Sequence, residues 1–558
     1  MYGKTFIAYL LIQMGITVSG LSLLWAQKAS IRVESMPIPT YGFGDPNPVA
    51  KMDVNYPYYH FDGYTKTSSA QNWQIVVLEN EYIKVYVAPQ IGGKVLGAFI
   101  KSSGKDFVYY NPVVKFRNIA SRGPWTSGGI EFNFGSYGHT VNTATPVDYL
   151  TTNNADGSVS CFVGAPNRTG HTYWQIEIRL PADQASFETN GTWHNENDLP
   201  VLSYHWSNAA FDVASDLQVN YPGTHEIFHD GLPGPYPVNE QAIDLSYYRN
   251  NDFGGSHSYH VLGQATDFYG AYYPSENWGM VHWSPFADKL GKKIWYWSLA
   301  RDGAIWVDLL TDPELGKGQY TELQSGLGYN QTLPSHSPFI VEDFAPMATE
   351  QFREHWYPIQ GMRGLTFANE TGALFAQVEN GKLNVQFSPV EEGDYPVALF
   401  IAGRKAVGET LHLKPMEVHS WSLDAENEDF TIDINQGGLH YATSEEKEKI
   451  LSRPLDGFRS DAAFATYLWG LQQLRAKDYH HARETLEQAL AQDSTLVPAM
   501  NALSELHLKQ MRYEEARHWI RKAMAWNTYD GEANYLFGVL SKTTAKDYDA
   551  LDGFSVAA

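Results

Sequence analysis

The residues with the most evident chemistry lie in one glycine-rich stretch, RGPWTSGGIEFNFGSYGHT, which begins at Arg122. Glu131 and Asn133 stand two positions apart, so on a strand their side chains would face the same way. Trp125 offers a flat apolar surface, and His139 titrates near neutrality. This is the inventory of a sugar site, in which we predict that Glu131 and His139 are catalytic and that Arg122, Trp125 and Asn133 bind substrate. The alternative is a glycine-rich strand and turn with half-buried polar residues.

A second ionisable cluster, HEIFHD from His225, has the residue spacing of a helical zinc site. Pro-Gly precedes it and Gly-Leu-Pro-Gly-Pro follows it, which predicts a loop without helical geometry. We therefore predict no metal here and place His225 at the rim of the sugar site as a substrate-binding residue. No glycine-rich phosphate-binding motif stands at the end of a predicted strand, so we expect no nucleotide and no other cofactor.

The elements that must position these residues are strands. From about Ser30 to Ile340, short segments are apolar or alternate with polar residues, as in WQIEIRL from Trp174. Turn-forming clusters such as NNADG at 153–157 separate them. Many strands without long amphipathic helices between them predict a mainly β protein, with a large antiparallel β-supersandwich at residues 30–345.

Several segments of this region resemble known proteins. PQIGGKVLG from Pro89, followed by DFVYYN from Asp106, is similar to the opening of galactose-mutarotase-like domains. NENDLPVLSYHWSN, which ends at Asn208, resembles the segment that carries the acid histidine of mutarotases, and YTELQ from Tyr320 resembles the segment with their base. Residues 50–558 together resemble a poorly characterised bacterial family that joins a mutarotase-like β-supersandwich to tetratricopeptide repeats.

The resemblance implies roles for particular residues. Glu322 takes the position of the base and His205 that of the acid, so both join the predicted catalytic residues. The sequence departs from the mutarotase pattern in two places: the spacing after His205 is one residue shorter, and Leu323 replaces a proline. The neighbouring residues predicted to bind substrate are Trp206, Asn208 and Gln324.

The period of the sequence changes toward the C-terminus. Ala482, Ala516 and Ala550 are 34 residues apart, and two further series of small residues keep this spacing, which predicts tetratricopeptide repeats at 461–558. Before the repeats, the sequence predicts a small β-sandwich at residues 364–423 and a linker at residues 424–460.

We expect the first repeat to dock on a β domain through its outer helix face. The third repeat stops at Ala558, and open repeat arrays need a capping helix. We therefore expect the natural chain to continue, with self-association or a protein partner as the alternatives. The apolar patch that would need covering is formed by Tyr535, Phe537, Leu540, Leu551 and Phe554.

The composition of the chain limits the functions and partners that are possible. The formal charge is -23 and no run of Lys or Arg occurs, so we expect no nucleic-acid partner. Cys161 is the only cysteine, which excludes an intrachain disulfide and a Cys-rich metal site.

Thr5 to Gln27 carry no charge, so we predict a signal peptide at 1–26 and export to the periplasm or surface of a bacterium. An uncleaved membrane anchor is the alternative.

The predicted function is that of a carbohydrate-active enzyme. Glu131 and Glu322 would form the carboxylate pair of a glycoside hydrolase, unless His139 or His205 supplies the proton. The first alternative is an aldose epimerase or a lyase, which needs one base and one acid. The second is a non-catalytic glycan-binding or scaffold protein that works through its repeats.

Overall fold

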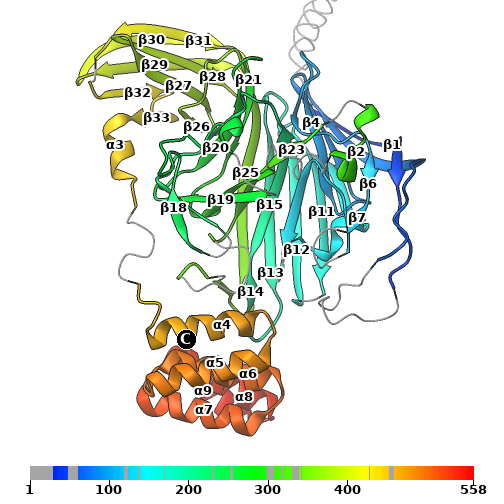
Figure 1. Cartoon of the computed structure of the whole chain (residues 1–558), viewed down its shortest axis with the longest axis vertical. Coiled ribbons are helices and arrows are strands. Elements are labelled where there is room, and N and C mark those ends of the chain that lie inside the picture. The colour runs from blue at the N-terminus through cyan, green and yellow to red at the C-terminus, as the bar shows by residue number, and fades with distance from the viewer. Residues whose placement is uncertain are drawn as a thin grey trace, which may run out of the picture.

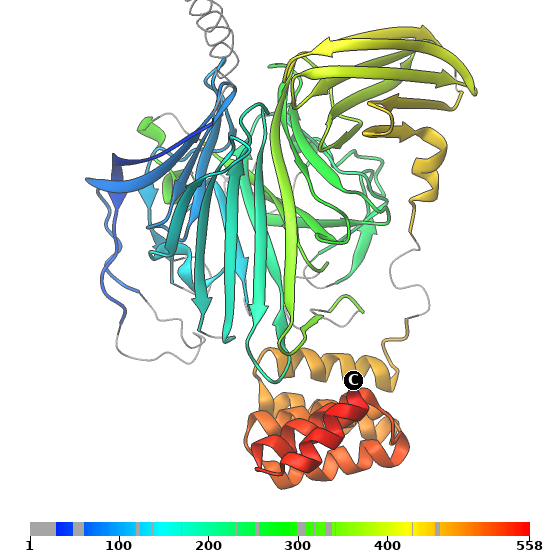
Figure 2. The ribbon, with the colours of Figure 1, turned by 180° about the vertical axis from the view of Figure 1, so that it is seen from behind.

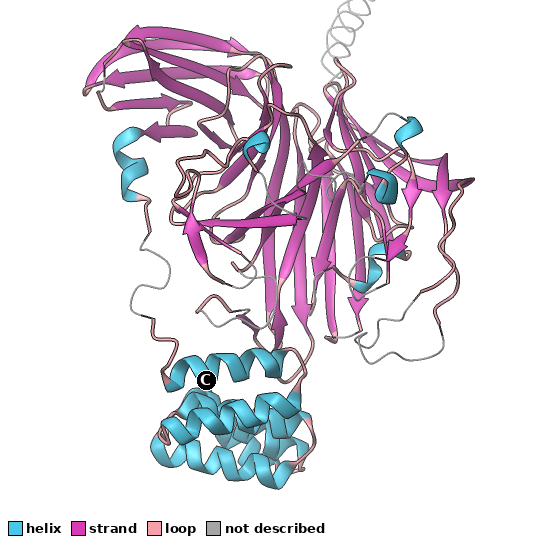
Figure 3. Ribbon diagram, viewed as in Figure 1, coloured by secondary structure: helices cyan, strands magenta, loops and turns pink. Residues whose placement is uncertain are grey.

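The protein consists of a large β domain, a small β-sandwich and a block of helices (Figures 1 and 2). The strands fill the upper part of the molecule in Figure 3, and the helical repeats lie below them. The computed structural model describes residues 29–47, 61–118, 123–135, 139–168, 170–228, 231–251, 256–297, 307–315, 318–329, 338–340, 342–426, 428–451 and 458–558. The predicted signal peptide at 1–26 lies outside the described residues.

The first layer of the β domain is a 13-stranded sheet. Its order is β18 (Pro233–Pro235), β17 (His225–Ile227), β19 (Ser256–Leu262), β22 (Gly291–Trp297), β23 (Tyr320–Gly326), β15 (His205–Asp212), β9 (Ile130–Phe134), β4 (Lys94–Ile100), β3 (Ile83–Ala88), β2 (Ser69–Glu79), β1 (Ser30–Tyr41) and β6 (Val114–Lys115), with β5 (Asp106–Val108) beside β4. All pairs are antiparallel except β1 with β6.

The second layer is an 8-stranded antiparallel sheet. Its order is β10 (Asp148–Asn153), β11 (Val159–Asn167), β12 (Thr172–Leu180), β13 (Phe187–Asn195), β25 (Thr349–Gln360), β21 (Trp278–Trp283), β20 (Phe268–Tyr273) and β16 (Gln218–Asn220). The alternation in β12 buries every second side chain against the first sheet. Trp174 of β12, for example, stacks on Phe134 of β9 with ring centroids 5.2 Å apart.

Short elements lie in the connections between the strands of these sheets. They are the paired strands β14 (Val201–Ser203) and β24 (Glu342–Phe344), the pair β7 (Arg117–Asn118) and β8 (Pro124–Trp125), and the 3-10 helices η2 (Val141–Ala144), η3 (Tyr248–Asn250) and η4 (Pro313–Leu315). β25, at Thr349–Gln360, runs through the middle of the second sheet. The β domain therefore extends beyond the predicted boundary at 345.

The small sandwich has two four-stranded sheets. One contains β26 (Phe367–Asn369), β27 (Gly372–Glu379), β28 (Lys382–Pro389) and β31 (His419–Asp424); the other contains β30 (Arg404–Leu413), β29 (Gly393–Ile401), β32 (Phe430–Ile434) and β33 (Leu439–Ala442). The predicted boundary at 423 is wrong, because β32 and β33 complete the second sheet and the helix α3 (Thr443–Glu448) follows. Gly437-Gly438, which suggested a linker, form the turn between these strands.

The helical domain contains α4 (Ala463–Arg475), α5 (Tyr479–Gln492), α6 (Val497–Lys509), α7 (Tyr513–Trp526), α8 (Gly531–Thr543) and α9 (Asp547–Ala557). Small residues at the predicted spacing let the paired helices approach: a Cβ on Gly470 would lie 2.8 Å from Leu486. The expected exposed patch is mostly absent, because Leu540 is buried, while Tyr535, Phe537 and Phe554 pack around it. Leu551 alone of that set is exposed.

Candidate active site

Strand alternation brings several predicted site residues onto one face of the 13-stranded sheet. The residues on either side of Glu131 pack into the core, so Glu131 points away from the second sheet. Asn208 of β15 lies opposite both Glu131 and Gln324 of β23. Glu322 lies two residues before Gln324 and shares its side of the sheet. We call this side the outer face.

Two glycines determine how the chain enters β9. Gly128 and Gly129 have positive φ angles of 78° and 71°. A Cβ on Gly129 would lie 2.0 Å from the carbonyl oxygen of Val95 on β4, so only glycine permits this approach. The start of the strand that carries Glu131 is fixed by this contact.

Both carboxylate oxygens of Glu131 are engaged. Nε1 of Trp125 donates to Oε2 at 2.5 Å, and Nδ1 of His139 contacts Oε1. His139 meets the rings of Trp125 and Trp206 edge to face, at centroid distances of 5.5 and 5.0 Å. Trp125 is only 3% exposed, so it positions the carboxylate instead of offering the open stacking surface that the sequence suggested.

Glu322 is buried among amides. Nε2 of Gln324 donates to its Oε2 at 2.8 Å, and the side chain of Asn208 also hydrogen-bonds to it. Burial raises the pKa of Glu322 to about 7, and the nearby charge of Glu131 contributes to the rise. The hydrogen bonds from Asn208 and Gln324 and the charge of Lys293 oppose it. A carboxyl group with this pKa can exchange a proton near neutral pH.

Two lysines complete the electrostatics of the outer face, and sequence reasoning missed both. Burial lowers the pKa of Lys94 to about 8 and that of Lys293 to about 7, while the charge of Glu322 opposes both shifts. Nζ of Lys293 lies 5.2 Å from the ring centroids of Trp206 and Trp295. The available signal was a lysine in or at the start of an otherwise apolar strand, which needs a buried anion to balance it.

Among the residues that the structure describes, three buried polar atoms on the outer face have no hydrogen-bond partner: Nδ2 of Asn133, Oδ1 of Asn208 and Oε1 of Gln324. Asn133 accepts from the backbone N–H of Thr140 at 2.7 Å, which leaves its amide nitrogen as an unused donor. Native proteins rarely leave buried polar groups unpaired, and such groups at a site are satisfied by water or a ligand. The set offers one donor and two acceptors, which suits a hydroxyl-rich ligand.

His205 does not belong to this site, and its predicted acid role is wrong on geometric grounds. It points into the core between the sheets, where its ring stacks on Phe352 at 4.5 Å. Burial and the neighbouring Lys289 hold its pKa well below the ordinary value, so it stays neutral. Because side chains alternate, the next residue, Trp206, is the one that reaches the outer face.

The remaining predicted residues lie at or beyond the edge of the site. His225 is on β17, in register with Leu262 of β19. β17 is three strands from β23, with β19 and β22 between them. Nδ1 of His225 is 2.9 Å from the hydroxyl of Thr224, and the structure does not bring this histidine to Glu322. Arg122 and the end of the HEIFHD cluster, at 229–230, lie outside the described residues.

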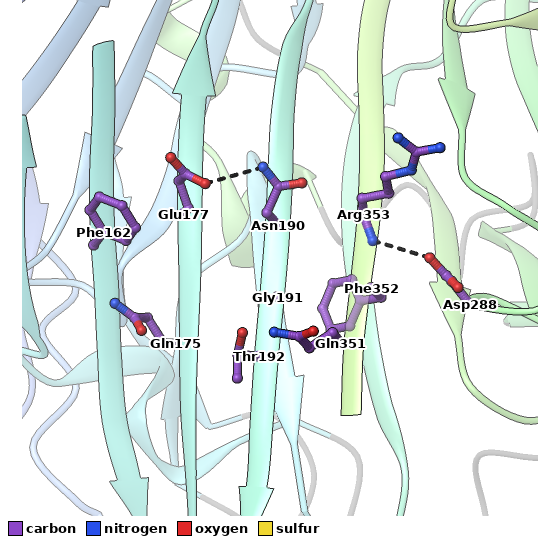
Figure 4. A pocket seen from close by; sticks show the side chains of 10 residues that line it. All are labelled: Phe162, Gln175, Glu177, Asn190, Gly191, Thr192, Asp288, Gln351, Phe352 and Arg353. Carbon is purple, nitrogen blue, oxygen red and sulfur yellow. Dashed lines mark hydrogen bonds between the residues drawn. The ribbon is translucent and has the colours of Figure 1, made fainter. Parts of the chain in front are cut away.

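The structure also contains a groove of about 380 Å³ that the sequence did not predict. Gln175, Asn190 and Gln351 line it from β12, β13 and β25 (Figure 4). These amides lie on the solvent side of the 8-stranded sheet, across the sandwich from Glu322. The groove is therefore separate from the outer-face site.

The described residues contain neither a membrane-spanning helix nor a metal-binding cluster. None of the helices there is long and apolar enough to cross a membrane. Within the same residues, no three His, Cys, Asp or Glu side chains cluster as metal ligands would.

Fold and site together define a two-layer β-supersandwich protein with a buried acid–base cluster and C-terminal helical repeats. The family described as DUF5107, a domain of unknown function, matches residues 50–359, and the chain belongs to this family.

One solved structure agrees at the level of the fold, and two others match less closely. A TPR-domain containing protein from Parabacteroides distasonis is similar with a TM-score of 0.54 and 17% identity, over 95% of this chain and 87% of that chain. A galactose mutarotase-like protein from Lactobacillus casei matches 51% of this chain and 99% of its own, with a TM-score of 0.37 and 12% identity. One from Clostridium acetobutylicum matches 52% and 96%, with a TM-score of 0.37 and 10% identity. The predicted fold class, a β-supersandwich joined to tetratricopeptide-type repeats, is confirmed.

Proposed function

We propose that the outer face binds a carbohydrate and catalyses proton transfer on it. The observation that carries this proposal is the set of unpaired buried atoms on Asn133, Asn208 and Gln324 beside a carboxyl group with a pKa near 7. Sugar hydroxyls both donate and accept hydrogen bonds, so a single ligand can satisfy all three atoms. Trp295, which is only partly buried, flanks the same place and supplies apolar surface.

The hydrogen bonds assign different roles to the two glutamates. Glu131 is held at both oxygens, so it orients His139. With Nδ1 of His139 directed at Glu131, Nε2 is the ring atom that would exchange a proton with the substrate. Glu322 serves as the second proton-transfer group, because its pKa lies near the operating pH.

The reaction that fits one base and one acid best is epimerisation of an aldose. Glu322 removes the proton of the anomeric hydroxyl, and His139 donates a proton to the ring oxygen as the bond from that oxygen to the anomeric carbon breaks. The open-chain aldehyde then recloses from either face, and each group recovers its starting protonation state.

Glycoside hydrolysis is the second candidate, because Glu131 and Glu322 share the outer face. They are two strands and two residues apart in register, which places their Cα atoms about 12 Å apart. Side chains reaching toward each other from that separation allow the ~6.5–9.5 Å carboxyl distance of an inverting enzyme. This reaction requires Glu131 to exchange one of its two partners for the substrate.

A panel of sugars separates the candidates. Exchange NMR on reducing monosaccharides measures interconversion of anomers, and aryl glycosides report hydrolysis by release of the phenol. We expect anomer exchange that Glu322→Gln reduces at least ~10²-fold, while Glu177→Gln, in the separate groove, leaves it unchanged. Phenol release without anomer exchange would favour the hydrolase. Sugar binding without either reaction would make the protein a glycan binder.

The cellular setting is part of the same proposal. We infer export to the periplasm or surface of a bacterium from the uncharged stretch between Thr5 and Gln27. Cell fractionation of the tagged full-length protein tests it, and retention in the cytoplasm would contradict it.

A further inference from the structure

The groove on the solvent side of the 8-stranded sheet is built from two rows of side chains that cross the strands (Figure 4). The first row contains Phe162, Glu177, Asn190 and Arg353, each opposite the next in register. The second row contains Gln175, Thr192 and Gln351. Neighbouring strands are ~4.8 Å apart, so the first row spans ~14 Å, which is longer than a single sugar ring.

The first row is already hydrogen-bonded. Oε1 of Glu177 accepts from the hydroxyl of Ser160 at 2.6 Å, and Oε2 accepts from Nδ2 of Asn190 at 3.3 Å. The guanidinium group of Arg353 lies over the ring of Trp283 at 5.2 Å and points away from Asn190 (Figure 4). Among the described lining residues Arg353 is the one cation, so no positive charge is directed into the groove.

The second row offers open polar groups. In the part of the chain that the structure describes, the side chains of Gln175, Thr192 and Gln351 form no hydrogen bond with another residue. Two amides and a hydroxyl can each donate and accept, as sugar hydroxyls do. An anionic ligand would leave the amide oxygens unpaired and would face the carboxylate of Glu177, so the groove favours a neutral ligand.

One end of the first row continues as an apolar surface. Leu150 of β10 lies opposite Phe162 and is 61% exposed. Tyr173, two residues before Gln175 on β12, is 41% exposed. A Cβ on Gly164 would lie 3.3 Å from the Tyr173 hydroxyl, so this ring reaches across β11 on the side that carries Phe162. Aromatic and apolar side chains beside open amides suit the apolar faces of sugar rings.

The floor of the groove is preformed. Gly191 of β13 lets the ring of Phe352 lie beneath the strand, because a Cβ at this position would be 2.1 Å from the ring. Phe352 belongs to the core between the sheets, where it stacks on His205. A ligand therefore meets a surface that needs little ordering on binding.

The helical repeats hold β13 at its end (Figure 2). In the turn after this strand, the carbonyl oxygen of Asp198 accepts from the hydroxyl of Tyr535 at 2.7 Å, and that of Pro200 accepts from Nζ of Lys509 at 2.8 Å. These donors are on α8 and α6, while α4 pairs with β24. The sequence predicted docking by the first repeat, but all three repeats take part. The middle strand of the groove is thus fixed by the core and by the repeats.

We propose that this groove is a binding site for neutral oligosaccharides, separate from the outer face. The sugar hydroxyls pair with the second row, and the rings stack toward Phe162 and Tyr173. Because the amides that bind it stand on the other sheet, across the sandwich from Glu322, the site holds a glycan chain on the protein without taking part in proton transfer. The proposal does not rest on the proposed function.

Titration calorimetry with the full-length protein tests the proposal. The probes are α- and β-linked neutral hexasaccharides of glucose, mannose, galactose and xylose, and an oligogalacturonate of the same length is the anionic comparison. We expect at least one neutral probe to bind. The double variant Gln175→Ala/Gln351→Ala should bind it at least ~10-fold more weakly, because two hydrogen bonds are lost. Gln377→Ala, at an exposed position on β27 of the small sandwich, should bind as the wild type does.

Further measurements localise the binding. Phe162→Ala should also weaken it at least ~10-fold, because the stacking surface is removed. Circular dichroism confirms that each variant is folded. Where a probe also binds the outer face, the isotherm shows two sites and the double variant loses one of them. No binding of any neutral probe, tighter binding of the oligogalacturonate, or equal affinities of the wild type and the folded double variant would overturn the proposal.

Discussion

Replacing Glu322 by glutamine keeps the shape of a buried side chain and removes its charge, which gives a measurable change in stability. Burial raises the pKa of Glu322 from 4.5 to about 7. The folded protein therefore binds the proton more tightly than the unfolded chain, and stability falls as pH rises from about 4.5 to about 7. At ~1.4 kcal/mol per pH unit, the charged carboxylate costs about 3.4 kcal/mol well above pH 7.

Glutamine has no such cost, so the variant should gain stability over the wild type as pH rises. We expect the difference in unfolding free energy to change by about 2.5 kcal/mol between pH 5 and pH 8.5 in favour of the variant. Denaturant titration, followed by the near-ultraviolet circular dichroism of the β domain, measures it at both pH values. Glu81→Gln, which neutralises an exposed carboxylate, should show no such trend.

The same variant also tests the catalytic role of Glu322, and here we expect a loss of activity instead of a gain in stability. In the wild type, kcat/KM for anomer exchange should rise with pH through about 7 as Glu322 ionises. In the variant this rise should be absent and turnover should be at least ~10²-fold lower. A stability difference between variant and wild type that is the same at both pH values, or a variant that keeps the ionisation in its rate profile, would refute the assignment of the pKa to Glu322.

Three further substitutions test other parts of the structure. Gly129→Ala places a Cβ 2.0 Å from the Val95 carbonyl oxygen at positive φ, so thermal unfolding should show a loss of at least ~1–2 kcal/mol; an unchanged melting temperature would contradict this packing. Trp125→Phe removes the indole donor to Glu131, and kcat/KM should fall about 10–100-fold, as expected for a charge-assisted hydrogen bond; full activity would exclude this role. Glu354→Gln breaks a fully buried network that includes His282, which should cost ~3–5 kcal/mol in denaturant unfolding, and a loss below ~1 kcal/mol would contradict it.

Sequence reasoning succeeded where strand periodicity alone decides the outcome. Glu131 and Asn133 are two residues apart, as are Glu322 and Gln324, so each pair had to share one side of its strand. That both pairs fall on the same side of one sheet followed from the family resemblance, not from periodicity. Their connection through Asn208 became visible only with the strand register.

His205 shows why the resemblance failed at one position. The segment after it is one residue shorter than in mutarotases, and a shift of one residue moves a side chain to the opposite side of a strand. Trp206 therefore takes the place on the outer face, and His205 enters the core. The departure was visible in the sequence, but its consequence required the alternation of β15.

The sequence could not predict the role of the two lysines or the positions of the domain boundaries, because both depend on tertiary contacts. The altered pKa values of Lys94 and Lys293 arise from burial, which no local pattern reports. β32 and β33 are short and polar on one side. β32 forms a strand because β29 offers it an edge, and β33 pairs in turn with β32. Likewise, the docking of three repeats depends on the turn at 198–200, far away in sequence.

A crystal structure of the protein with a bound aldose tests the central claim most directly. The account predicts that sugar hydroxyls pair with Nδ2 of Asn133, Oδ1 of Asn208 and Oε1 of Gln324, with the anomeric carbon between Glu322 and His139. A sugar bound only in the groove beside Asn190, with those three atoms still unpaired, would contradict it.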